Sequence, residues 1–227
     1  MTYDWDWRAT ERSHRRALEL GPGLSFVHGN YSFLLACVGR FDEALEQARR
    51  AERLDPLSLV ASQQVGLILY LARRYDESIA QLEKSVELNP YYWLTYQRLA
   101  QVLLATGDFE RGIKIMKRGI ELAGPDTLRS GKHTLGSLFA RSGRRPEALE
   151  ILNRLLEQEK TTYVPPTDIA QIHTALGNND DAFEWLEKAV EARDADFFML
   201  RVWPVWDPLR EDPRFDDLLR QMGFPAT

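Results

Sequence analysis

A pattern that returns at a nearly fixed spacing constrains this chain more than any other feature. The stretch Gly39–Pro56, GRFDEALEQARRAERLDP, returns in altered form at Arg73 and again at Gly107, each time after 34 residues. Further copies begin at Gly143, after 36 residues, and at Gly177, after another 34. Such a period predicts a chain built from one supersecondary unit that is repeated and stacked.

Each copy reads as the second helix of a helix pair, because small residues recur on one helical face. The first small position holds Ala44, Ser78, Gly112, Ala148 and Ala182. Seven residues later stand Ala51, Ser85, Gly119 and Ala189, with Leu155 in the fourth copy. Twelve residues before the first position stand Ser32, Gly66, Ala100, Gly136 and Ala170. Small side chains on a shared face let a neighbouring helix approach closely, so we predict stacked helix pairs.

This pattern resembles the tetratricopeptide repeat, with its period of 34 residues, its two helices and its proline at the exit. The exit position holds Pro22, Pro56, Pro90 and Pro125. The resemblance implies an all-α fold, a right-handed α-solenoid of antiparallel helix pairs forming a single domain over residues 1–227. We expect a half repeat at 4–22, five repeats over 24–193 and a C-terminal capping element over 195–227.

The end of the chain carries a second resemblance. Gly177–Glu191, GNNDDAFEWLEKAVE, and the bulky apolar stretch 195–227 are similar to the C-terminal repeat regions of bacterial regulators. Those regions follow a winged-helix, cyclase or Ser/Thr-kinase domain. The resemblance implies a regulatory or sensory module. The half repeat at 4–22 lacks a first helix, so we expect either that the chain is cut from a longer protein or that a partner covers this end.

Composition limits the environment and the partners. A single cysteine, Cys37, forms no intrachain disulfide and suits a reducing compartment. The N-terminus has no signal-peptide pattern and no apolar run is long enough to span a membrane, so we expect a cytoplasmic protein. The net charge is −5, and residues 180–227 hold 12 acidic and 6 basic residues. This segment is either a solvated cap or an acidic docking surface. No clustered basic surface indicates nucleic-acid binding.

No pattern of catalytic or metal-binding residues appears, and we expect neither an enzyme nor a cofactor. The four histidines are His14, His28, His133 and His173, and no two of them lie three or four residues apart as a helical metal pair requires. His173 and Cys37 read as core residues. An active site assembled from distant residues is the alternative that sequence spacing leaves open.

The resemblance places a binding surface on the concave face, which the first helices line. The inward positions that we assign to partner binding are Gln63, Tyr70, Gln97, Gln101, His133, Arg141 and Gln171. Phe26 and Val60 occupy further inward positions at the start of two first helices. Apolar side chains beside amides suit a protein or peptide ligand, because amides can bond to a peptide backbone.

Two other functions remain open from the sequence. The half repeat carries Trp5 and Trp7, which lie two residues apart and cannot both face inward on a regular helix. Either they cap the stack, or they join two copies of the chain into a homodimer. Sensing of a small ligand is the second alternative, and it requires a deep, closed pocket.

Overall fold

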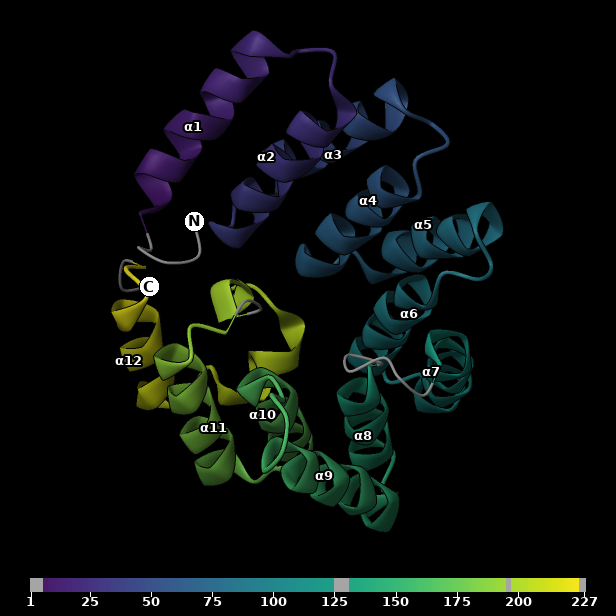
Figure 1. Cartoon of the computed structure of the whole chain (residues 1–227), viewed down its shortest axis with the longest axis vertical. Helices are drawn as coiled ribbons and strands as arrows, with labels where there is room; N and C mark the ends of the chain where they lie inside the picture. Colours follow the sequence, from purple (N-terminus) through teal and green to yellow (C-terminus); the bar gives the residue numbers. More distant parts are fainter. Residues whose placement is uncertain (1–5, 125–130, 195–196, 225–227) are drawn as a thin grey trace. The chain divides into compact units, whose positions relative to one another are not determined.

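The computed structural model describes residues 6–124, 131–194 and 197–224, and every regular element in them is helical (Figure 1). Trp5 and Pro125 lie outside the described residues. The α-helices are α1 Trp7–Leu20, α2 Ser25–Cys37, α3 Phe41–Leu54, α4 Leu59–Leu71, α5 Tyr75–Leu88, α6 Trp93–Thr106, α7 Phe109–Ala123, α8 Lys132–Arg141, α9 Arg145–Glu159, α10 Pro166–Leu176, α11 Asn179–Glu191 and α12 Pro213–Gln221. Two 3-10 helices, η1 Phe197–Met199 and η2 Pro204–Leu209, lie between α11 and α12.

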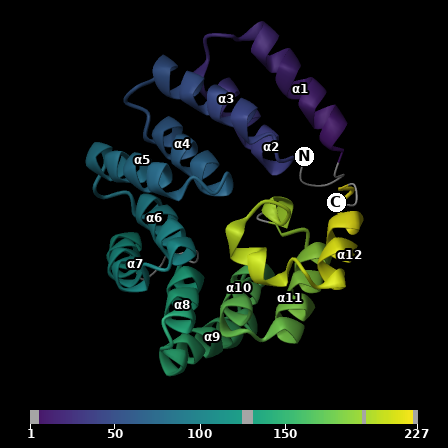
Figure 2. The same ribbon diagram turned by 180° about the vertical axis from the view of Figure 1, so that it is seen from behind.

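The contacts divide the chain into two compact units. Unit 1 comprises Met1–Pro90 together with Arg201–Pro204. Unit 2 comprises Tyr91–Leu200 and Val205–Thr227. In unit 1 the helix α1 packs on α2, α2 packs on α3 and α4 packs on α5 (Figures 1 and 2). In unit 2 the packed pairs are α6 with α7, α8 with α9, and α10 with α11. The five pairs from α2 to α11 follow the predicted repeats and confirm the all-α repeat architecture.

The small residues that set the predicted register lie where helices approach most closely. Ala44, Ser78, Ala148 and Ala182 are fully buried. Gly112 is buried as well, and a Cβ added to it would lie only 2.7 Å from Cδ2 of Leu138. A larger side chain at these positions would separate packed helices, which explains why small residues recur there.

The turn between the two helices of each pair contains one residue in the left-handed region. Glycine holds this position in four repeats, at Gly39, Gly107, Gly143 and Gly177, with φ between 77° and 83°. Glycine suits the position because it has no Cβ to clash with the next carbonyl oxygen. The exception is Arg73, with φ 63°.

The helix α12 packs against α11. Its N-cap is Asp212, whose carboxylate accepts a hydrogen bond from the backbone N–H of Arg214. The Arg214 side chain then reaches α11, where it bonds to Asp180 at 2.9 Å and lies 4.2 Å from the ring centroid of Phe183. Pro213 in the first turn of α12 and Gly223 just after its last residues bracket this short helix.

Candidate functional site

Two sets of side chains occupy matching places on the first helices, because the repeat spacing returns each of them to the same helical position. The first set consists of Gln63, Gln97, His133 and Thr167. The second consists of Leu67, Gln101, Ser137 and Gln171. All eight side chains are buried, with relative exposures of 9% or less. Seven of the eight are polar, so these positions differ from an ordinary apolar core.

Polar contacts join three successive first helices in unit 2. The Nε2 atom of Gln97 on α6 lies 3.3 Å from the Nε2 atom of His133 on α8. The other ring nitrogen of His133, Nδ1, lies 3.0 Å from Oδ2 of Asp168 on α10. The three residues are between 5% and 9% exposed. A carboxylate on one nitrogen and an amide on the other fix the orientation of the imidazole ring.

A second buried carboxylate anchors the end of α11 to the start of α10. Asp194 is 3% exposed, and its Oδ2 atom accepts hydrogen bonds from the backbone N–H and the hydroxyl of Thr167, at 3.2 and 2.6 Å. Charge-assisted bonds of this length hold a buried carboxylate firmly. Asp194 therefore fixes where the C-terminal segment leaves the last repeat.

The predicted partner-binding residues differ in their access to solvent. Arg141, at the end of α8, is exposed. The other six are buried: Gln63, Tyr70, Gln97, Gln101, His133 and Gln171. The ring of Tyr70 lies 6.1 Å from that of Tyr75. Their assignment to partner binding stays a prediction, and Arg141 is the member of the set that an external partner can reach in this structure.

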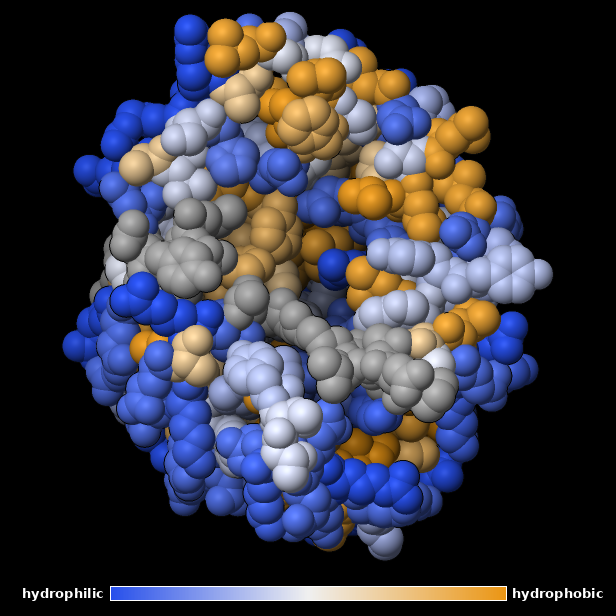
Figure 3. All heavy atoms as spheres, viewed as in Figure 1, coloured by the Kyte–Doolittle hydropathy of each residue, from blue (hydrophilic) through white to orange (hydrophobic). Residues whose placement is uncertain are grey.

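Exposed apolar side chains gather on unit 1, over the turns before α2 and before α4 (Figure 3). They are Leu20, Leu24, Phe26, Leu57 and Val60, with relative exposures between 48% and 84%. Phe26 and Val60 lie 34 residues apart, in the first turns of successive first helices. A side chain of this kind gains free energy when a partner removes it from water.

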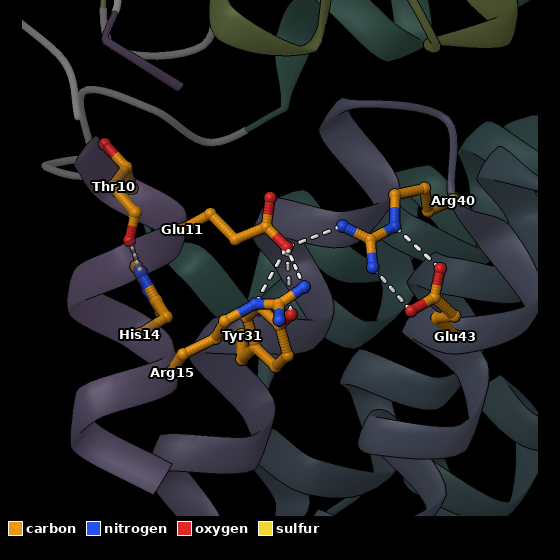
Figure 4. Close-up of polar contacts among 7 residues, drawn as sticks. All are labelled: Thr10, Glu11, His14, Arg15, Tyr31, Arg40 and Glu43. Carbon is orange, nitrogen blue, oxygen red and sulfur yellow. Dashed lines mark hydrogen bonds and ion pairs between the residues drawn. The ribbon is translucent and has the colours of Figure 1, made fainter. Parts of the chain in front are cut away.

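The N-terminal helix is held by a cluster of charges (Figure 4). Glu11 on α1 accepts hydrogen bonds through Oε1 from the Tyr31 hydroxyl at 3.2 Å and from Nη1 of Arg40 at 2.6 Å. The same oxygen accepts a bond of 2.8 Å from Arg15. The bonds from Arg40 and Arg15 lower the pKa of Glu11. Trp7 is half-buried at the start of α1.

The turn after α4 makes a long-range contact. Nη1 of Arg73 donates a hydrogen bond of 2.8 Å to the backbone oxygen of Val202, 129 residues further along the chain. The same nitrogen donates to the backbone oxygen of Leu71 at 2.9 Å. Both ends of the longer contact belong to unit 1.

The residues considered for chemistry lie in the core. Cys37 is fully buried, and burial raises the pKa of its thiol to about 12. Burial lowers the pKa of His173, while Asp181 and Glu184 act in the opposite direction. No three His, Cys, Asp or Glu side chains come together as a metal site anywhere in residues 6–124, 131–194 and 197–224. The described helices are all too short or too polar to cross a membrane.

A surface hollow of about 520 Å³ lies beside α11 in unit 2. It is lined by the loop after α9 and by Trp185 on α11. Nζ of Lys188 lies 4.0 Å from the centroid of the Trp185 ring. Tyr163 on its rim is 64% exposed. The hollow is thus open to water, unlike the deep, closed pocket that sensing of a small ligand requires.

Sequence reasoning missed Asp168 and the contact of Arg73, although both had a signal. Asp168 is the one acidic residue in the five first helices. Arg73 stands where the other four repeats carry glycine. Each of these two residues departs from the repeat pattern, and each makes a polar contact with a residue distant in the sequence.

Comparison with known proteins identifies the repeat. Family models described as tetratricopeptide repeat match residues 38–92 and 133–197, and residues 95–126. No curated protein is similar enough in sequence to match.

Three solved structures illustrate the structural similarity. TTC0263, a thermophilic TPR protein in Thermus thermophilus, is 21% identical with a TM-score of 0.59, over 82% of this chain and 99% of that one. Yeast Tom70 is 17% identical with a TM-score of 0.59, over 94% of this chain and 46% of that one. MamA 41-end from Desulfovibrio magneticus RS-1 is 20% identical with a TM-score of 0.56, over 70% and 88%. At such identities the likeness shows the fold.

Proposed function

Because this chain belongs to the tetratricopeptide-repeat family, a family of protein-interaction scaffolds, we propose that it is a non-enzymatic module that binds a peptide or a partner segment along its first helices. The observation that carries the proposal is the exposure of Phe26 and Val60, at 64% and 71%. Both are apolar side chains kept in water at matching positions of successive repeats. A partner that crosses α2 and α4 would meet one such side chain on each of these two helices.

The setting of this module is part of the same proposal. We propose that it serves a larger bacterial regulator in the cytoplasm, with an effector domain of the winged-helix, cyclase or Ser/Thr-kinase type. The support is the likeness of Gly177–Glu191 and residues 195–227 to such regions. No role in nucleic-acid binding is proposed, because binding of the phosphate backbone needs a clustered basic surface and none stands out in the sequence.

A peptide library displayed on phage or yeast and selected against the full chain tests the proposal. We expect selected peptides to bind at least about tenfold more weakly to V60D, since a buried, unpaired carboxylate is costly. R141E tests the accessible member of the predicted set in unit 2. The melting temperature should stay near wild type in both variants, because both side chains are exposed.

The matched control is K114E, a charge reversal at an exposed position of α7, which is a second helix. It should bind the peptides as the wild type does. If neither V60D nor R141E weakens any selected peptide, binding along the first helices is wrong.

Self-association is the second candidate function. The observation in its favour is that α1, an amphipathic helix that packs on α2, has no fully buried residue. A second copy of the chain could cover its half-exposed face, with two-fold symmetry as the default.

A further inference from the structure

Arg73 occupies a backbone conformation that disfavours it. Its φ of 63° lies in the left-handed region, where the four equivalent turn residues are all glycine. An arginine there brings its Cβ close to the following carbonyl oxygen, so the turn itself gives no reason to carry it. The reason must lie in what the side chain contacts.

One contact of this side chain is with the backbone of the C-terminal segment. The guanidinium donates a hydrogen bond of 2.8 Å to the Val202 oxygen. It also donates to Leu71 at the end of its own helix, which fixes the direction of the side chain. The donor is a guanidinium group, so this bond is charge-assisted.

The contacted segment has the features of a bound peptide. Arg201–Pro204 belongs to unit 1, whereas its neighbours Leu200 and Val205 belong to unit 2. It lies between η1 and η2, and residues 201–203 are not helical, so the backbone is open to recognition. Val202 and Trp203 are each 5% exposed. A side-chain donor on a backbone carbonyl, beside buried apolar side chains, is a way in which a receptor holds a non-helical peptide.

We propose that Arg201–Pro204 is an internal peptide ligand of unit 1, held by Arg73, and that external partner segments of the same chemistry compete with it. That chemistry is an irregular backbone in which an aliphatic residue is followed by an aromatic one and a proline. The inference rests on the proposed function, because it names the regulation of that function and the class of peptide. Gln63 and Tyr70, two predicted partner-binding residues on the helix that precedes Arg73, are buried in the same unit.

The first experiment needs no partner. R73G restores the glycine of the other repeats, so the chain should fold as the wild type does while the side-chain bond is lost. Hydrogen–deuterium exchange on the full chain should show amides 201–203 exchanging about tenfold faster, because losing the bond to the Val202 carbonyl oxygen lets the segment detach from unit 1 more often.

R74A is the matched control, because it removes the neighbouring arginine, whose partner is Glu77 on the surface. It should leave exchange at 201–203 unchanged. If exchange at these amides is the same in R73G as in the wild type, the internal ligand is refuted, whatever the fate of the proposed function.

The second experiment measures competition with a labelled peptide, RVWPVWD, which repeats residues 201–207. W203A weakens the internal ligand and leaves Arg73 in place, so fluorescence anisotropy should report binding to this variant at least about tenfold tighter than to the wild type. R73G should show no such gain, because the group that would hold the peptide is absent.

The outcomes separate the two ideas. Faster exchange in R73G with no peptide binding to W203A would overturn competition by external segments. If the selected library peptides bind the wild type, R73G and W203A equally well, the proposed function is kept and this regulation is refuted. Should W203A fail to fold, the exchange measurement on R73G still decides whether Arg201–Pro204 is held by Arg73.

Discussion

At the scale of single residues, Gly119 sets how closely α7 approaches α6. A Cβ added to Gly119 would lie 2.9 Å from Cβ of Tyr96 and 3.4 Å from the backbone oxygen of Trp93. A side chain cannot rotate its own Cβ away, so the contact could be relieved only by moving a helix. A Cβ added in the same way to Gly29, within α2, would meet no atom within 4 Å.

We therefore expect opposite effects from one chemical change at these two glycines. G29A should raise the free energy of unfolding by about 0.5–1 kcal/mol, because alanine favours helix over glycine. G119A should lower it by about 1–2 kcal/mol, because overpacking outweighs the same gain. Denaturant unfolding of both variants measures the difference. A stabilised G119A would contradict the close approach of α6 and α7.

At the scale of elements, α1 differs from the other helices that form the repeats. It contains no fully buried residue, and the carboxylate of Glu11 bonds to Tyr31 on α2 and to Arg40, the N-cap residue of α3 (Figure 4). The pKa of Glu11 is lowered, chiefly by Arg40 and then by Arg15. A carboxyl with a lowered folded-state pKa contributes stability above its unfolded pKa, about 4.3, and loses it as the pH falls through the lower folded value.

E11Q should therefore loosen the attachment of α1 at neutral pH, and in the wild type acidification from about pH 4.3 through the lower folded-state pKa should do the same. Hydrogen–deuterium exchange is expected to speed up over residues 7–20 and to change little in α4 and α5. The control is E19Q, since Glu19 pairs with Arg16 at a site where both side chains are more than 60% exposed. Unchanged protection of α1 in E11Q would show that apolar contacts alone hold it.

At the scale of the whole molecule, the number of copies in solution separates the two candidate functions. If α1 pairs with a second copy, sedimentation velocity should show a dimer that dissociates on dilution by about a hundredfold. W7A should shift this equilibrium toward the monomer, because Trp7 lies on α1. The control L57A removes a side chain that is 84% exposed before α4 and should sediment as the wild type does.

A chain that stays monomeric at the highest concentration tested would eliminate self-association and leave the peptide-binding module. Trp5 belongs to the same hypothesis, but it lies outside the described residues. The substitution test of this hypothesis therefore uses Trp7 alone.

The repeat could be predicted from the amino-acid sequence alone. Helix pairs follow from local rules: a fixed period, small residues at set positions of each helix, and turns of glycine and proline. Ala44, Ser78, Ala148 and Ala182 are fully buried where this pattern places them. The family and the all-α fold could be predicted for the same reason, since each repeat mainly contacts its neighbours.

The sequence pattern did not predict which polar residues are buried or what they contact, because both depend on how the helices pack. Gln97, His133 and Asp168 come from three different helices, and Arg73 meets Val202 across 129 residues. The periodic pattern describes what the repeats share, whereas these contacts depend on where individual repeats depart from it. The exposure of a side chain also depends on which residues pack around it in the folded chain. For this reason Arg141 is exposed and Gln171 is buried, although both were assigned to one binding surface from the sequence.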